Sequence, residues 1–287
     1  MHQAQARLAT AHDARPGARP RTRLQLLRSH WPLMLRRTLL GERRTVTAWA
    51  ERDAAALGVH LAAGGAGPVG GDRLGLEVRV GAGSTLVLGE VSPTVLLPGP
   101  HGEESRFDVG IRVEAGGTLA WLPQPVIAAH GCRHRTAVHV ALAAGARLLL
   151  REEVLFGRYG EQPGALRQRL RVEVEDRPLY DQELAAGPDA PGWDGPAVTG
   201  GRHAVGSVLL VDPAADPHAR TDDDGGGGGA DSAVMALPGP GLLISALAPD
   251  STALRRRLDA ALDGVLAAPP SPDRAPRAAC AVRGSSV

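Results

Sequence analysis

Residues 80–86 read Val-Gly-Ala-Gly-Ser-Thr-Leu, and two later segments repeat this frame: residues 113–119 read Val-Glu-Ala-Gly-Gly-Thr-Leu and residues 142–148 read Leu-Ala-Ala-Gly-Ala-Arg-Leu. Gly83, Gly116 and Gly145 hold the same place in the frame, where glycine can supply the positive φ of a tight turn. They lie 33 and 29 residues apart, and a period near 30 in β-structure is typical of two-stranded units that stack to bury their apolar faces. The alternative is three ordinary hairpins of a β-sandwich.

Strand patterns continue outside the repeat. Apolar and polar residues alternate over residues 74–80, 109–113 and 170–174, which is the period of a strand with one buried face. Helical spacing is strong only near the end, where Ser251 could cap a helix that buries Leu254, Leu258 and Leu262 and stops at Pro269. The sequence therefore predicts a mainly β, layered and partly β-helix-like single domain over residues 22–267, with one or two helices including the C-terminal one.

The composition excludes several classes of protein. The chain has 287 residues, 32 basic residues that are all Arg, 31 acidic residues, 43% hydrophobic residues and only two Cys. Two Cys cannot form a disulfide framework, and no apolar run is long enough to cross a membrane. No secretion signal opens the chain, so we expect a cytoplasmic protein that does not contact a membrane.

Three segments lack the pattern of a packed element. Residues 1–21 are rich in Arg and carry Pro16 and Pro20, so a disordered leader is expected there. The Asp-Gly run at 222–229 predicts a flexible loop, and residues 268–287 predict a disordered tail. A basic leader could instead bind nucleic acid, but residues 1–21 contain no aromatic residue to stack on a base. We therefore expect no nucleic-acid partner.

One short cluster has the residue types of a metal site. His130, Cys132 and His134 are two residues apart, so on a regular strand their side chains share one face, and imidazole and thiolate suit nickel, copper or zinc. The alternative is a polar strand edge, because Arg133 and Arg135 would occupy the opposite face.

Carboxylates are the other candidates. Glu152 and Glu153 follow the apolar run at 148–150, so one of them should point inward, where a carboxylate is costly unless it is paired or binds a metal. Ion pairs with Arg151 or Arg158 would be the ordinary explanation, and Asp72 could simply cap the Gly-rich turn before it. An inward acid also leaves open a β-helical carbohydrate-active enzyme, although a protein with eight aromatic residues is poor in sugar platforms.

Four segments, in order, resemble a known family. They are the stretch from Thr22 to Thr38 with Pro-Leu-Met-Leu-Arg at 32–36, the Gly-rich run at 64–71 that ends in Gly-Gly-Asp at Asp72, Leu-Ala-Trp-Leu-Pro-Gln at 119–124, and Glu-Glu-Val-Leu-Phe-Gly-Arg at 152–158. Together they resemble the urease accessory protein family UreD, also called UreH, in an actinobacterial-type branch. The likeness runs from about residue 22 to residue 267.

The resemblance implies a role that composition alone does not. UreD-like proteins are not enzymes: they bind apo-urease, the helical protein UreF and the GTPase UreG, and act as a scaffold for inserting Ni²⁺ into urease. The family fold is a layered β-structure with two helices, and nickel is thought to pass through an internal tunnel. On this chain the tunnel acids would correspond to Asp72 and Glu152, whereas Gln182 stands where another acid is expected, beside Glu183. Nickel would be a transported ion, with no cofactor held stably.

Overall fold

The three repeated segments form the corners of a coil in which each unit places one strand in each of two sheets. In the computed structural model, Gly83, Gly116 and Gly145 have φ angles of +64°, +63° and +69°. The corners stack directly, because Gly83 N–H donates to Ala115 O across 3.0 Å and Gly116 N–H donates to Ala144 O across 3.1 Å. The prediction of stacked two-stranded units is confirmed. The units are β5 (Arg73–Val80) with β6 (Thr85–Glu90), β8 (Ser105–Val113) with β9 (Thr118–Leu122), and β11 (Arg133–Leu142) with β12 (Arg147–Phe156).

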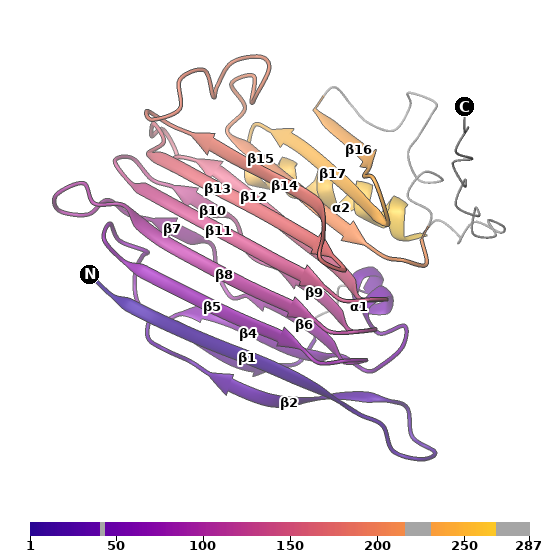
Figure 1. Ribbon diagram of the computed structural model, residues 1–287. Helices are drawn as coiled ribbons and strands as arrows, with labels where there is room; N and C mark the ends of the chain where they lie inside the picture. The colour runs from indigo at the N-terminus through magenta and orange to yellow at the C-terminus, as the bar shows by residue number, and fades with distance from the viewer. Residues whose placement is uncertain (41–43, 216–230, 268–287) are drawn as a thin grey trace, which may run out of the picture.

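The strands assemble into two sheets that face each other (Figure 1). Sheet A has seven strands in the order β14 (Arg177–Ala186), β13 (Ala165–Val174), β11, β8, β5, β1 (Gln3–Asp13) and β2 (Arg21–Arg28). Sheet B has ten strands; its main path runs β16 (Ser232–Ala236), β17 (Gly241–Ala248), β15 (Ala204–Val211), β12, β9, β6, β4 (Leu57–Ala63) and β3 (Leu33–Thr38). Off this path, β10 (Val126–Ala128) pairs with the end of β12, and β7 (Thr94–Leu96) pairs with β10. The coil strands run parallel within each sheet, and antiparallel strands flank them.

The structure describes residues 1–40, 44–215 and 231–267. The loop predicted at 222–229 and the tail predicted at 268–287 lie outside these residues. Within them the fold is mainly β, with stacked sheets and two helices, as the sequence predicts.

The main core fills the space between the two sheets. Strand alternation directs Leu76 and Val78 of β5 inward from sheet A, and Leu86 and Leu88 of β6 inward from sheet B. Because parallel coils repeat this pattern, the inward residues form continuous rows from one coil to the next.

Both helices pack on the outer side of sheet B. Helix α2 (Ser251–Ala267) buries Leu254, Leu258 and Leu262 against β15 and β17, as predicted. Its cap is Asp250 rather than Ser251, since Asp250 Oδ1 accepts a hydrogen bond from Ala253 N–H across 2.8 Å. No helix in the described ranges has both the length and the apolar composition of a membrane span.

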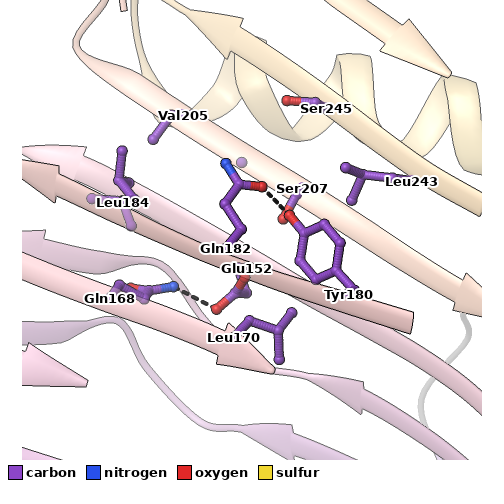
Figure 2. A pocket seen from close by; sticks show the side chains of 12 residues that line it. Glu152, Gln168, Leu170, Tyr180, Gln182, Leu184, Val205, Ser207, Leu243 and Ser245 are labelled. Atoms are coloured by element: carbon purple, nitrogen blue, oxygen red, sulfur yellow. Dashed lines mark hydrogen bonds between the residues drawn. The ribbon is translucent and has the colours of Figure 1, made fainter. Parts of the chain in front are cut away.

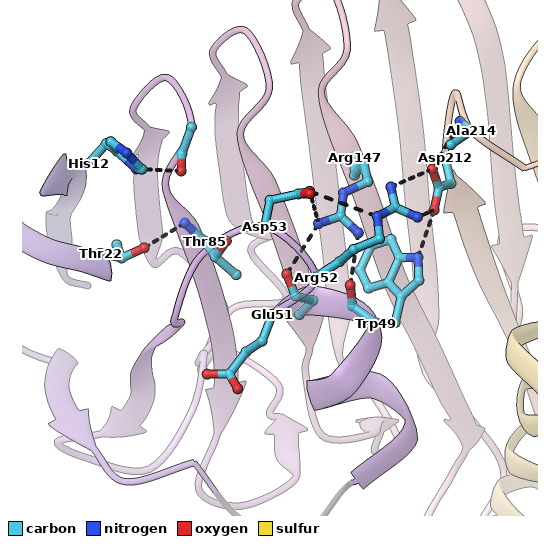
Figure 3. A network of polar contacts seen from close by, with 12 residues as sticks. His12, Thr22, Trp49, Glu51, Arg52, Asp53, Thr85, Arg147, Asp212 and Ala214 are labelled. Atoms are coloured by element: carbon cyan, nitrogen blue, oxygen red, sulfur yellow. Dashed lines mark hydrogen bonds and ion pairs between the residues drawn. The ribbon is translucent and has the colours of Figure 1, made fainter. Parts of the chain in front are cut away.

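Helix α1 (Arg44–Ala50) is tied to sheet B by a buried guanidinium (Figure 3). Arg147 at the start of β12 donates to the carbonyl oxygens of Trp49 and Ala50 across 2.8 and 3.2 Å. These carbonyls lie at the C-terminal end of α1, where a cation is favourable. Arg52 pairs with Asp212 across 3.1 Å, so the segment after α1 is also anchored.

The N-terminal segment differs from its sequence prediction. Residues 3–13 form β1, which lies between β2 and β5 in sheet A, so the expectation of a disordered leader over residues 1–21 is wrong there. Ala4, Ala6 and Leu8 are buried while the residues between them face outward. The strand was missed because two of its inward residues are Ala, which gives the alternation little hydrophobic contrast.

Candidate functional site

Strand β12 places two adjacent acids on opposite sides of sheet B. Even-numbered residues of the strand face the inter-sheet space, where Leu148 and Leu150 join the main core. Glu152 continues this row, whereas Glu153 faces helix α2. The expectation that one of the two acids points inward is confirmed, and the inward residue is Glu152.

A cavity of about 80 Å³ lies around Glu152 between the sheets (Figure 2). Sheet B contributes Glu152, Ser207 and Ser245, which are laterally paired on β12, β15 and β17. Sheet A contributes Gln168 from β13 and Tyr180 and Gln182 from β14, with Leu170, Leu184, Val154, Val205, Gly206 and Leu243 completing the wall. The volume is sufficient for several water molecules. All the polar walls present oxygen or amide groups.

Gln168 joins the two sheets at this cavity. Its Nε2 donates to Glu152 Oε1 across 2.7 Å. The Oε1 of Gln168 is buried and has no hydrogen-bond partner among the described residues. Tyr180 O–H donates to Gln182 Oε1 in the same wall. The cavity thus holds a carboxylate and an unsatisfied amide oxygen, two acceptors that a water molecule or a cation would satisfy.

Burial controls the charge of the cavity. Desolvation raises the pKa of Glu152 to about 6, although the hydrogen bond from Gln168 opposes the rise. Burial, together with the nearby charge of Glu152, raises the pKa of Tyr180 to about 12, so its hydroxyl stays protonated. At neutral pH Glu152 is mostly ionised, and a cation in the cavity would hold it so.

The neighbouring arginines do not neutralise Glu152. Arg151 pairs with the buried Glu153 across 3.2 Å and with Asp259 across 2.6 Å. Arg158 pairs with Glu161 across 2.7 Å. The ion-pair explanation therefore fits Glu153 and not Glu152, which no described cation pairs within 4.0 Å.

Asp72 lies away from this cavity and has a different role. It is buried before β5, where its Oδ2 accepts from Val69 N–H across 3.1 Å and its Oδ1 accepts from His2 N–H across 2.6 Å. The N-terminal amine lies 4.0 Å from the same carboxylate. The interpretation of Asp72 as a cap of the Gly-rich turn is confirmed, and the structure does not bring it beside Glu152.

The residues His130, Cys132 and His134 do not form one site. His130 is exposed in a turn that precedes β11, so the strand spacing that would align the three does not apply to it. Cys132 is buried in a small apolar cluster, where burial raises its pKa to about 11. Both ring nitrogens of His134 have partners: Ser105 Oγ lies 2.7 Å from Nδ1 and Thr136 Oγ1 lies 3.0 Å from Nε2. Burial lowers the pKa of His134 to about 4.

Across residues 1–40, 44–215 and 231–267, no three His, Cys, Asp or Glu side chains form a metal-binding group.

The sequence analysis missed one inward acid, Glu90. It follows Leu86 and Leu88 on the same face of β6, and burial raises its pKa to about 7. Gln124 N–H donates to its Oε2 across 3.3 Å. The strand register places one strand, β9, between Glu90 and Glu152, so their backbones lie roughly 10 Å apart. The signal was present, since Glu90 lies two residues after Leu88 and four after Leu86, a spacing that keeps one face of a strand.

Gln182, which stands where the resemblance implies an acid, is also a lining residue of the cavity. Gln182 lines the wall opposite Glu152, whereas the adjacent Glu183 faces outward and pairs with Arg167 across 3.2 Å. Glu183 therefore does not replace the acid that is expected at residue 182.

Comparison with known proteins gives one consistent family. The family model for the UreD urease accessory protein matches residues 2–278. A urease accessory protein UreD of Streptomyces avermitilis is 40% identical over 263 residues, which covers 91% of this chain and 97% of the relative. One from Streptomyces griseus, UreD 3, is 42% identical over 266 residues, covering 92% and 96%, and one from Streptomyces coelicolor is 40% identical over 262 residues, covering 90% and 95%. The match includes β1, so the likeness begins before residue 22. With its coiled two-sheet fold and this extent of similarity, the chain belongs to the UreD urease accessory protein family.

Proposed function

We propose that this chain is a non-enzymatic scaffold of urease maturation, which acts with UreF and the GTPase UreG in the cytoplasm to deliver Ni²⁺ to apo-urease. The observation that carries the proposal is the Glu152 carboxylate facing a small polar cavity between the sheets. The names of the relatives support the coarse role, because each is a urease accessory protein. In this proposal nickel is the cargo of the scaffold and not its resident cofactor.

The donor set of the cavity suits passage better than storage. Glu152, Ser207 and Tyr180 present oxygen atoms, and nickel binds more tightly to imidazole and thiolate. A route must bind the ion strongly enough to admit it and weakly enough to release it. Glu90 would extend the route along the inner face of sheet B, because its strand β6 is separated from β12, the strand of Glu152, only by β9. Asp72 is less suited to the route because its two carboxylate oxygens already accept from Val69 N–H of the Gly-rich turn and from His2 N–H.

Two other functions find less support. A carbohydrate-active enzyme needs a pair of carboxyl groups flanking a sugar, and Glu152 is the single carboxylate among the described residues that line the cavity. About 80 Å³ between two sheets is also too small for a sugar ring and its neighbours. Nucleic-acid binding through a free basic leader loses its basis, since residues 3–13 are a strand of sheet A.

The test is urease activation in cells or in a purified system that contains urease, UreF and UreG. Glu152→Gln keeps the shape and the acceptor for Gln168 but removes the charge, so we expect the complex to form and activation to fall several-fold. Glu175→Gln, at an exposed turn, is the matched control and should activate normally. Normal activation by Glu152→Gln would remove the nickel route, and failure to co-purify with either partner would remove the scaffold role.

A further inference from the structure

The outer face of sheet A is a broad surface that no described helix covers (Figure 1). Helices α1 and α2 pack against sheet B, on the far side of the molecule. The side chains of this face point away from the inter-sheet space, so any role it has is separate from the cavity at Glu152. Its residues are the outward members of the alternating strands β1, β5, β8, β11 and β13.

Four arginines form one lateral row on this face. The strand registers pair Arg73 with Arg106, Arg106 with Arg135, and Arg135 with Arg167, on four adjacent parallel strands. Neighbouring strands are about 4.8 Å apart. Like charges directly opposite each other on a sheet are destabilising. A row of four is therefore costly unless something outside the row supplies negative charge.

Most other arginines on the face have acidic partners, but three members of the row do not. Arg7 pairs with Glu77 across 3.0 Å, Arg133 with Asp189 across 3.0 Å, and Arg169 with Asp181 across 2.7 Å. Within the row, Arg167 pairs with Glu183. Arg73, Arg106 and Arg135 form no ion pair with any residue of the described ranges, and we call these three the arginine row.

The arginine row also has unsatisfied donors and an open hollow beside it. The Nε atoms of Arg106 and Arg135 are buried and lack a hydrogen-bond partner in the described part of the chain. At one end of the row, an open hollow of about 520 Å³ is lined by Arg73, Arg106, Gln5 and His30, with Asp108 as its one acid. His30 Nδ1 accepts from Gln5 N–H across 3.0 Å, so the neutral ring carries its proton on Nε2 and can donate to a ligand.

We propose that the arginine row is a docking site for an acidic helical segment of a partner protein. Carboxylates pair with guanidinium groups through two parallel hydrogen bonds, which suits three side-by-side arginines. The strand positions of this face carry no Phe, Tyr or Trp among the described residues, because Phe107 and Tyr180 point inward, and so they offer no stacking surface for bases. The carboxylate of Asp108 also disfavours a polyphosphate.

The spacing of the row selects a helix over an extended segment. Three adjacent strands place the arginines at about 0, 4.8 and 9.6 Å. Asp or Glu at positions i, i+3 and i+7 of a helix lie at about 0, 4.5 and 10.5 Å along the helix axis. Side chains on one face of an extended strand are about 6.6 Å apart, so the third of them lies about 13 Å from the first, beyond the third arginine at about 9.6 Å. The occupant is therefore an acidic helix that lies across the strands of sheet A.

The test measures binding of the full chain to a labelled helical peptide of about 15 residues with Glu at i, i+3 and i+7. A scrambled peptide of the same composition is the first control. Arg106→Glu is the central variant, because the new carboxylate lies between Arg73 and Arg135 and pairs with both, so the fold is not weakened by repulsion. Arg28→Glu, an exposed arginine of β2 outside the row, is the matched control.

We expect the patterned peptide to bind roughly tenfold more tightly than the scrambled one, and Arg106→Glu to remove that preference with an unchanged or higher melting temperature. Arg28→Glu should leave the preference intact. Equal binding of the two peptides, or a preference that survives Arg106→Glu, overturns the proposal. Tighter binding of a single-stranded oligonucleotide that depends on the same row would overturn it in favour of a nucleic-acid partner.

Discussion

Gln168 of sheet A donates a 2.7 Å hydrogen bond to Glu152 of sheet B, and this contact crosses the inter-sheet space at the candidate cavity. The polar side chains of Ser207, Ser245, Tyr180 and Gln182 line the same cavity, whereas the main core between the sheets is made mostly of Val and Leu. The donor partly offsets the cost of burying a carboxylate, and it fixes the direction of Glu152. The first prediction concerns this pair.

Gln168→Met should leave the partly buried Glu152 without its donor. Because the hydrogen bond lowers the pKa of Glu152, its loss should raise that pKa above the present value of about 6. The free energy of unfolding should fall by about 1–3 kcal/mol at pH 8 and by less at pH 5, where Glu152 is protonated. Urea denaturation at the two pH values measures this. Gln162→Met, at an exposed position, should show no such pH dependence.

Glu90→Gln should stabilise the protein at alkaline pH. Burial raises the pKa of Glu90 from 4.5 to about 7, so the folded state keeps its proton over a window in which the unfolded chain releases it. The stability of the unmodified protein therefore falls as the pH rises from 4.5 to about 7, and the neutral amide avoids this loss. We therefore expect the free energy of unfolding of Glu90→Gln, taken relative to the unmodified protein, to be higher at pH 8 than at pH 4.5 by on the order of 3 kcal/mol. Thermal unfolding across this pH range measures the stability difference between Glu90→Gln and the parent. A difference that does not change with pH would contradict the burial of Glu90.

His134 should give the opposite dependence. Burial lowers its pKa from 6.5 to about 4, so the unfolded chain binds a proton first and stability falls as the pH drops from 6.5 towards 4. The full effect is about 3 kcal/mol. His134→Gln removes the titrating group, so the stability difference between variant and parent should change across this window and stay constant above pH 7. Using the difference cancels the contributions of Glu90 and Glu152, which titrate in overlapping ranges.

Arg147→Met should loosen helix α1. The substitution leaves the Trp49 and Ala50 carbonyl oxygens without their buried donor, which should cost about 2–3 kcal/mol. Arg147→Lys keeps the charge but loses the planar set of guanidinium donors, so its free energy of unfolding should lie between those of the parent and of Arg147→Met. Amide exchange of α1 and chemical denaturation are the readouts. Arg79→Met breaks only the exposed pair with Glu114 and should cost less than about 1 kcal/mol.

Leu8→Ala should show that the N-terminal segment is part of the core. Leu8 is buried on β1, and truncating it should lower the free energy of unfolding by about 2–5 kcal/mol. Leu26→Ala, at a position of β2 that is 43% exposed, is the control and should have little effect. Removal of residues 1–13 should leave the β5 edge unpaired and give an insoluble protein. A trimmed chain that stays as stable as the parent would restore the view of a dispensable leader.

The site was only partly predictable from the sequence. Alternation along β12 was enough to say that one of Glu152 and Glu153 points inward, since side chains of a strand alternate by geometry alone. It could not place Gln168, which lies in the other sheet and meets Glu152 only after the coils stack. For the same reason the sequence pattern could not predict that His130 lies in a turn while Cys132 and His134 are buried.

The coil of two-stranded units is already encoded in the amino-acid sequence. Each repeated corner is encoded locally, by a glycine that adopts positive φ between two apolar strands, and the helix at 251–267 is encoded by its own spacing. Which strands become neighbours is set by the packing of the whole chain. It placed β1 inside sheet A, set Gln168 against Glu152, and aligned Arg73, Arg106 and Arg135 across three strands. These relationships join residues far apart in the chain, so they depend on the register of stacked coils, which no local pattern of side chains contains.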